Sequence, residues 1–133
     1  MILVDSSVLI DFLGSAAPRP KARLLARLIE QDVPFAICPF VYQEVLQGTA
    51  DEPAYDKVKA YLDSQECLWL PPGLEVYAKA ARIYWDLRRR GVTVRGTIDV
   101  LIALTAIEHE ALLLHDDRDF DAIAAHLPQL QLA

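Results

Sequence analysis

Short, entirely apolar runs alternate along this chain with longer segments of helical periodicity. The clearest runs are residues 1–4, 34–38 and 111–114, and a helical pattern follows each of them within a few residues. Strands that are apolar on both faces are typical of parallel sheets that helices cover on both sides. The alternation therefore predicts an α/β fold built on a parallel sheet.

Apolar side chains at helical spacing predict seven helices. They cover residues 8–13, 21–31, 40–47, 53–65, 74–90, 97–110 and 120–126. Two further short strands are expected at residues 68–70 and, at an edge of the sheet, 130–132. Ser6 and Ser7 have the hydroxyl side chains of helix N-caps, and Gly91 is placed to end the long helix that precedes it.

The composition predicts a single soluble domain that spans residues 1–133. Hydrophobic residues make up 53% of the chain, which is ample for one buried core. The net charge of −6 argues against a protein that holds nucleic acid only through a broad basic surface. No apolar stretch reaches the ~20 residues that span a bilayer, so we expect no membrane partner and a cytoplasmic location. The two cysteines, Cys38 and Cys67, lie among apolar residues and are expected to remain free.

Four carboxylates lie at or shortly beyond the predicted carboxyl ends of strands. Asp5 comes directly after the first strand, and Asp117 follows the strand at 111–114 by three residues. Glu44 lies on the helix that leaves the second strand. Asp99 lies in the first turn of an otherwise apolar helix, where the helix dipole favours negative charge. Parallel sheets bind ligands beyond the carboxyl ends of their strands, so these four side chains can converge on one cleft.

Such a group of like charges is unfavourable by itself and implies a compensating cation. Close carboxylates raise one another's pKa. Mg²⁺ and Mn²⁺ prefer oxygen ligands, and a pair of such ions can clamp the attacking and leaving oxygens of a phosphoryl transfer. Each acid alone also has a structural interpretation: Asp5 could be a turn residue or cap, Glu44 a solvated residue, and Asp99 a capping-turn acid. Asp116 or Asp119 could likewise be the N-cap of the last helix.

Three segments of the sequence resemble the PIN-domain superfamily, and within it the VapC-type toxins of bacterial and archaeal toxin–antitoxin pairs. They are MILVDSSVLIDFL at the start, FVYQEVLQG in the middle and TIDVLIALTAIEHEALLLHDDRDFDAIA near the end. The resemblance spans essentially the whole chain, and the combination of segments is more specific than any one of them. It implies a small three-layer α/β/α sandwich with a central, mostly parallel sheet.

The resemblance also implies a Mg²⁺- or Mn²⁺-dependent endoribonuclease with four acidic catalytic positions. These positions fall on Asp5, Glu44, Asp99 and Asp117. Asp5 and Asp99 would be the principal metal ligands, and Glu44 and Asp117 would complete the site directly or through water. Asp119 is the second choice for the fourth position, and the same segment also offers Asp116.

In enzymes of this family a water activated by the metal attacks a phosphodiester bond of a tRNA or an rRNA, and the metal charge stabilises the phosphate. Ser6 stands where the family has a threonine, and Ser7 supplies a second hydroxyl beside the first acid. The resemblance further implies a VapB-type antitoxin, encoded beside the toxin, that binds it and silences it.

Basic residues near the acids are candidates for holding RNA. Arg95 lies shortly before Asp99, and Arg82 and Arg89 lie on the long helix at residues 74–90. The arginines of that helix could equally form an ordinary solvated helix face. The 53% hydrophobic content of so small a chain also predicts an apolar helix face, covered by a second copy in a homodimer and by the antitoxin.

Two other functions remain open from the sequence. A receiver-like domain would bind Mg²⁺ through an acidic pair and accept a phosphoryl group on an aspartate that follows its third strand, with a lysine after its fifth. Here prolines follow the segments 34–38 and 68–70, and Asp117 stands where the lysine is expected. The other alternative is a non-catalytic PIN-like module that acts only through protein contacts, which the presence of all four acids disfavours.

Overall fold

The computed structural model describes residues 1–133, with five strands and seven helices. The strands are β1 (Ile2–Val4), β2 (Phe35–Ile37), β3 (Glu66–Cys67), β4 (Leu112–Leu114) and β5 (Gln131–Leu132). The helices are α1 (Ser6–Gly14), α2 (Pro20–Glu30), α3 (Pro39–Gln47), α4 (Glu52–Asp63), α5 (Glu75–Arg89), α6 (Thr97–Glu108) and α7 (Arg118–His126).

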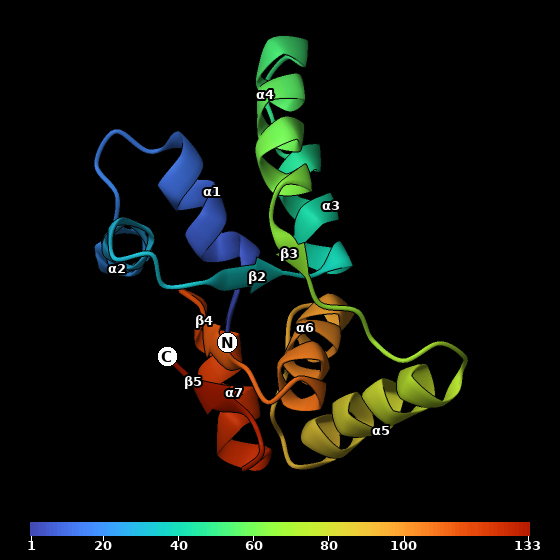
Figure 1. Ribbon diagram of the computed structural model, residues 1–133. Helices are drawn as coiled ribbons and strands as arrows, with labels where there is room; N and C mark the ends of the chain where they lie inside the picture. The colour runs from blue at the N-terminus through green and yellow to red at the C-terminus, as the bar shows by residue number, and fades with distance from the viewer.

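All five strands form one sheet in the order β3-β2-β1-β4-β5, and every pairing in it is parallel. The central strand β1 pairs with β2 through Leu3 opposite Ala36, and with β4 through Val4 opposite Leu114. The carboxyl ends of β1 and β4 therefore lie side by side, and the Asp5 N–H donates to the Leu114 carbonyl at 2.9 Å. In Figure 1, α1 and α2 lie on one side of the strands and α6 and α7 on the other, which confirms the predicted α/β/α sandwich.

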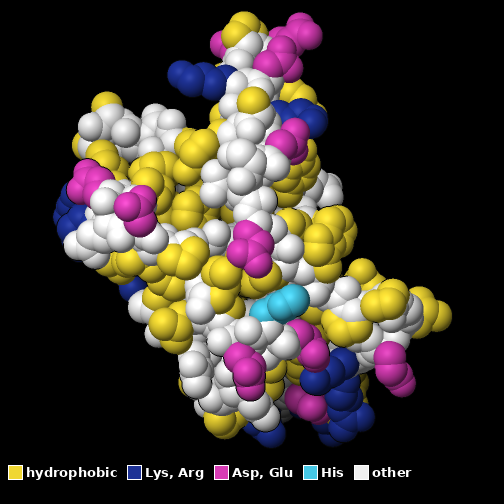
Figure 2. Space-filling view, viewed as in Figure 1, with side chains coloured by type: hydrophobic (Ala, Val, Ile, Leu, Met, Phe, Trp, Pro, Cys, Tyr) yellow, Lys and Arg dark blue, Asp and Glu magenta, His cyan; other side chains and the backbone are white.

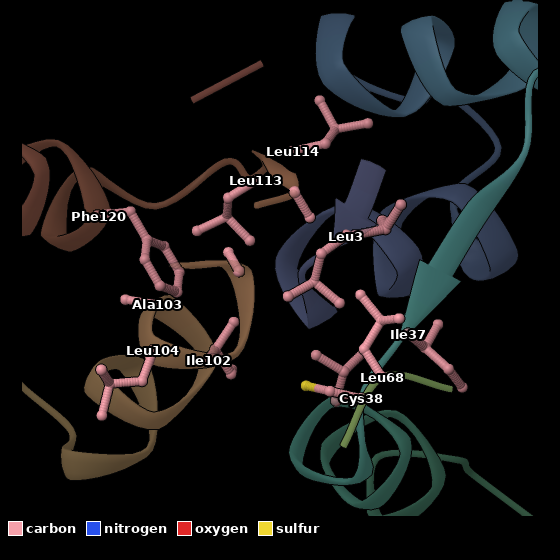
Figure 3. Packing of buried hydrophobic residues seen from close by; sticks show 14 of the residues in the cluster. Leu3, Ile37, Cys38, Leu68, Ile102, Ala103, Leu104, Leu113, Leu114 and Phe120 are labelled. Carbon is pink, nitrogen blue, oxygen red and sulfur yellow. The ribbon is translucent and has the colours of Figure 1, made fainter. Parts of the chain in front are cut away.

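The core forms one cluster of 28 buried residues on the two faces of this sheet. Leu3 and Val4 of β1 are both fully buried, which explains why this strand has no polar face. Half of the α6 residues are buried, and they lie all around the helix, so its sequence is apolar without a distinct polar face. Figure 3 shows Phe120 of α7 beside Leu113 of β4 and Ala103 of α6, so the last helix is anchored against the sheet.

The predicted helix boundaries agree with the structure to within two residues, but the prediction of the third strand is wrong. We expected this strand at residues 68–70, and β3 is Glu66–Cys67. The Leu68 N–H still donates to the Ile37 carbonyl at 2.8 Å, after which the chain leaves the sheet and Trp69 is 67% exposed. Prolines follow at positions 71 and 72, and because proline has no N–H to donate, the segment does not continue as a strand.

α5 has 15 residues, the most of any helix here, and it ends in the turn that the sequence predicts. Gly91 has a φ of +78°, a conformation that glycine adopts without strain. The N–H groups of Gly91 and Val92 donate to the carbonyls of Arg88 at 3.0 Å and Leu87 at 2.9 Å, which are the paired bonds of a Schellman motif. The turn leads into a short loop that carries Arg95 to the start of α6. No helix of the protein combines the length and the apolar character needed to cross a membrane.

Candidate metal centre

Asp5 lies where β1 ends and α1 begins, and it is only 3% exposed. Its Oδ2 accepts hydrogen bonds from the Ser7 N–H at 3.0 Å and from the Ser7 hydroxyl at 2.6 Å. Asp5 is therefore the N-cap of α1, and the prediction that Ser6 or Ser7 caps this helix is wrong. The reason is that the carboxylate of the last residue before the helix reaches the free N–H groups of the first turn.

The other carboxylate oxygen of Asp5 has no partner in the protein. This atom, Oδ1, is buried and accepts no hydrogen bond. Burial raises the pKa of Asp5, hydrogen bonds from Ser7 and from the Ser6 N–H oppose the rise, and the charge of Asp117 adds to it. A buried carboxylate oxygen without a partner is unfavourable unless a proton or a further ligand reaches it.

Glu44 reaches the same place from α3. Its Oε1 accepts a hydrogen bond from the Ser6 hydroxyl at 2.9 Å, which links the first turn of α1 to the middle of α3. Burial raises the pKa of Glu44, the bond from Ser6 opposes this, and the charge of Asp5 raises the pKa further. Ser6 therefore lies inside the helix and positions an acid instead of capping the helix.

Asp99 lies in the first turn of α6, and its pKa reports the acids around it. Burial is the main cause that raises this pKa, to about 7, and the charges of the other acids add to the rise. Those acids are Asp5, Asp117, Glu44 and Asp119. The structure therefore brings together the four acids that the sequence singled out, with Asp119 as a fifth.

Asp117 and Asp119 lie where the chain leaves β4 and enters α7. Asp117 is the N-cap of α7, because its Oδ1 accepts a hydrogen bond from the Asp119 N–H at 2.9 Å. The structural interpretation of Asp116 or Asp119 as this cap is therefore wrong. One carboxylate oxygen from each of Asp99, Asp117 and Asp119 lies within 4.8 Å of the other two, which is close enough to hold one metal ion.

Asp116 points away from this triad. Its carboxylate pairs with Arg19 at 2.7 Å, and its N–H donates to the Ser7 hydroxyl at 3.0 Å. Ser7 therefore connects the ends of β1 and β4, since it also donates to Asp5. His115 of the same segment is 6% exposed and packs on the Phe120 ring, with 5.2 Å between ring centroids.

Arg95 contacts two of the acids directly, a contact that the sequence analysis missed. Its guanidinium Nη2 lies 2.8 Å from Asp117 Oδ1, and its Nε lies 3.0 Å from Asp119 Oδ2. Burial acts to raise the pKa of Asp119, but the hydrogen bonds and charge of Arg95 outweigh it and hold the pKa below its usual value. The spacing of Arg95 from Asp99 indicated that it lies near the acids, but no signal in the sequence identified its partners.

Arg82 and Arg89 lie on α5, outside the acidic cluster. Their guanidinium groups lie 4.4 and 4.5 Å from the centroid of the Trp85 ring. Trp85 is 37% exposed. Arg82 also pairs with Asp86 at 3.1 Å. Figure 2 shows basic side chains gathered beside hydrophobic ones on this part of the surface.

The donor set fits a hard divalent cation. Every candidate ligand is a carboxylate oxygen, which Mg²⁺ and Mn²⁺ prefer, and the unpartnered Asp5 Oδ1 is an oxygen of this kind. Burial raises the pKa of the Cys38 thiol to about 12, so this cysteine does not offer the thiolate that zinc favours. Burial also raises the pKa of Cys67.

Comparison with known proteins agrees with this fold. A family model described as PIN domain matches residues 2–126, so the chain belongs to the PIN-domain family. Within the family it belongs with the VapC-type members. It is 35% identical over 136 residues to VapC ribonuclease Mb1587 of Mycobacterium bovis, and the match covers 100% of this chain and 98% of that protein. It is 32% identical over 98 residues to Ribonuclease VapC17 of Mycobacterium tuberculosis, over 72% of each chain.

Solved structures show the same fold. VapBC2 from Rickettsia felis, bound to a DNA fragment from its promoter, matches with a TM-score of 0.73 and 19% identity, over 100% of this chain and 98% of the other. VapBC-1 from nontypeable Haemophilus influenzae matches with a TM-score of 0.71 and 18% identity, over 100% and 97%. The predicted family is confirmed, and membership of it decides against a receiver-like domain.

Proposed function

We propose that this protein is the toxin of a VapBC-type pair and that it acts as a Mg²⁺- or Mn²⁺-dependent endoribonuclease on a tRNA or an rRNA. The observation that carries the proposal is the convergence of five carboxylates from four segments on one partly buried site. The charges of four of them act on Asp99 and, with burial, raise its pKa to about 7. The similar proteins of Mycobacterium bovis and Mycobacterium tuberculosis are named as ribonucleases, which agrees with this chemistry.

Asp5 and Asp99 are proposed as the principal metal ligands, and Glu44, Asp117 and Asp119 as acids that complete the site. Asp5 Oδ1 is buried without a partner, and an oxygen of Asp99 lies within 4.8 Å of oxygens of Asp117 and Asp119. A divalent ion, when bound, supplies positive charge for the phosphate and for activation of the attacking water.

The remaining site residues hold these acids in position. Ser7 fixes the Asp5 carboxylate at 2.6 Å and ties it to the backbone of Asp116 at 3.0 Å. Ser6 fixes Glu44 at 2.9 Å. Because each hydroxyl bonds one carboxylate oxygen, the second oxygen of the same group is left to face a ligand. Rigid positioning of this kind lowers the cost of binding an ion in the right geometry.

Arg95, Arg89 and Arg82 are proposed to hold the RNA. Arg95 lies at the rim of the acidic site with its side chain 63% exposed, so it can contact the phosphate beside the bond that is cut. Arg82 and Arg89 flank the exposed Trp85, and arginine with an aromatic ring suits an unpaired nucleotide. These positive charges offset the net charge of −6 along the path of the RNA.

A VapB-type antitoxin and a second copy of the chain are the proposed protein partners. The similar solved structures include VapBC assemblies and a toxin–antitoxin complex from Klebsiella pneumoniae. The surface offers apolar area for such contacts: a groove of about 310 Å³ lies between α5 and α6, and Tyr77 beside it is 47% exposed. The protein is proposed to act in the cytoplasm, where its RNA substrate is found.

Expression in a bacterial host tests the activity. The wild-type chain is expected to arrest growth, Asp5→Asn to relieve the arrest, and Asp56→Asn to leave it unchanged, because Asp56 is exposed on α4 and forms no ion pair. Sequencing the 5′ ends of cellular RNA after a short pulse of expression, with Asp99→Asn as the comparison, identifies the cut. An Asp5→Asn protein as toxic as the wild type would remove the nuclease and leave a module that acts through protein contacts.

A further inference from the structure

Arg95 already neutralises part of the acidic cluster without any metal ion. Its Nη2 bonds Asp117 Oδ1 at 2.8 Å, and its Nε bonds Asp119 Oδ2 at 3.0 Å. One planar guanidinium therefore bridges two carboxylates, with one charge-assisted hydrogen bond to each. Both acids also belong to the triad, with Asp99, whose oxygens lie within 4.8 Å of one another.

An ion in that triad and Arg95 in its present position compete. The lone pairs that accept hydrogen bonds from a guanidinium are less available to a metal, and the two positive charges repel each other. The proposed metal site is therefore weakened by a residue of the same chain as long as Arg95 stays between Asp117 and Asp119.

The Arg95 side chain can leave Asp117 and Asp119 while the loop between α5 and α6 stays in place. The side chain is 63% exposed, whereas the side chains of Asp117 and Asp119 are 26% and 9% exposed. The backbone N–H of Arg95 forms its own bond to Asp119 Oδ2 at 3.2 Å. This bond holds the loop in place when the guanidinium turns outward, and Gly96 beside it has no side chain to obstruct the turn.

We propose that Arg95 is an internal counter-cation: it holds Asp117 and Asp119 while no divalent ion is bound, and ion binding releases its guanidinium toward the RNA phosphate. The proposal rests on the proposed function, because it needs the metal and the RNA. In this proposal Arg95 binds oxyanions in turn, first the carboxylates of Asp117 and Asp119 and then an RNA phosphate.

This coupling gives one substitution two opposite effects. Removing the guanidinium removes a competitor, so the metal-binding affinity rises. Removing it also removes a phosphate contact, so RNA binding falls. A purely structural ion pair would instead lower both, because the loss of Arg95 would leave Asp117 and Asp119 less well positioned.

Mn²⁺ binding to the full-length protein, measured from the EPR signal of free Mn²⁺, tests the first effect. Arg95→Gln is expected to bind Mn²⁺ about three- to tenfold more tightly than the wild type, a modest change because the pair is exposed to water. Arg95→Lys keeps the charge but cannot bridge two carboxylates, so its affinity should lie between the two. Arg90→Gln is the matched control, because Arg90 forms no ion pair and should leave the affinity unchanged.

A second measurement needs no substitution in the protein under test. The ¹⁵N–¹H signal of Arg95 Nε, assigned by its loss in Arg95→Lys, should shift as Mg²⁺ is added to the wild type. If the wild type binds Mn²⁺ but Arg95→Gln binds it equally or more weakly, or if the Nε signal stays in place as Mg²⁺ binds, this inference is overturned and the nuclease proposal stands. If the wild type binds no Mn²⁺ at all, both fall together.

Discussion

The two halves of the acidic cluster are built differently. On the side of α7, Asp117 and Asp119 share the Arg95 guanidinium, and Asp116 pairs with Arg19. On the side of β1, α3 and α6, no cation pairs with Asp5, Glu44 or Asp99. The N–H and hydroxyl of Ser7 donate to Asp5, and the hydroxyl of Ser6 donates to Glu44.

The pKa values follow this division. Burial raises the pKa of Asp5, Glu44 and Asp99, whereas Arg95 holds the pKa of Asp119 below its usual value. In this structure, protein cations thus serve one half of the cluster, whereas the other half has no positive partner. The comparison teaches that the unpaired half has no counter-charge without an ion from solution, whereas an ion must compete with Arg95 for the oxygens of Asp117 and Asp119.

The largest expected effect comes from removing a charge in the unpaired half. Asp99→Asn should lower the rate of RNA cleavage about 10²–10³-fold, which corresponds to the several kcal/mol of charge stabilisation that a metal supplies. The rate is measured with purified protein and Mg²⁺, with Asp56→Asn as the control. Equal losses in the two variants would mean that Asp99 contributes no more to cleavage than an exposed aspartate outside the cluster.

Removal of the serine hydroxyls that donate to Asp5 and Glu44 should have an intermediate effect on the rate of RNA cleavage. Ser7→Ala removes the bond to Asp5 at 2.6 Å and the acceptor for the Asp116 N–H, and about a tenfold loss of activity is expected. Ser6→Ala removes one bond, to Glu44 at 2.9 Å, and should cost about threefold. Cleavage rates and Mn²⁺ affinity are measured for both variants. A larger loss of activity in Ser6→Ala than in Ser7→Ala would contradict this prediction.

The two halves should also respond to pH in opposite ways. Between about pH 4 and pH 7 the folded protein keeps a proton on Asp99 that the unfolded chain has lost, so stability falls as pH rises through this window. For Asp119, with its lowered pKa, stability is lost as pH falls below the usual aspartate pKa. In EDTA, the melting temperature should drop about 5 °C from pH 5 to pH 7.5, and Asp99→Asn should reduce the drop. An equally steep drop in Asp99→Asn would mean that other groups cause it.

The smallest effects are expected from the basic residues far from the acids. Arg89→Ala and Arg82→Ala should each weaken RNA binding about two- to threefold and lower its dependence on salt concentration, because each removes one phosphate contact. Titration of a labelled RNA at several salt concentrations measures both quantities. An unchanged salt dependence would indicate that these two arginines only cover Trp85, with Arg82 also paired to Asp86.

Periodicity predicted the helices and the parallel sheet because apolar strands and amphipathic helices leave a local pattern in the sequence. It failed at β3, where Leu68–Leu70 is apolar but the exposed Trp69 and the prolines at 71 and 72 take the chain away from the sheet. Local residue preferences alone do not decide which of several neighbouring polar groups caps a helix. Asp5 and Asp117, not the serines or Asp116, reach the free N–H groups.

The acids of the site could be proposed from their positions after strands and from the family resemblance, and the structure brings them together. Their individual roles remain predictions. The partners of Arg95 and the link from Ser7 to Asp116 could not be foreseen. They join segments 22 to 109 residues apart, and no periodic pattern records such long-range pairings.

The position of β1 between β2 and β4 has a consequence for how the protein is made. During synthesis, β1 lacks one of its two neighbours until β4, at residues 112–114, has been made. Asp117 and Asp119 arrive later still, so a nascent chain carries an incomplete set of acids until the start of α7 has been made. Under the proposed function, a chain still in translation, or one truncated before α7, would thus lack a complete set of acids and could not cleave RNA.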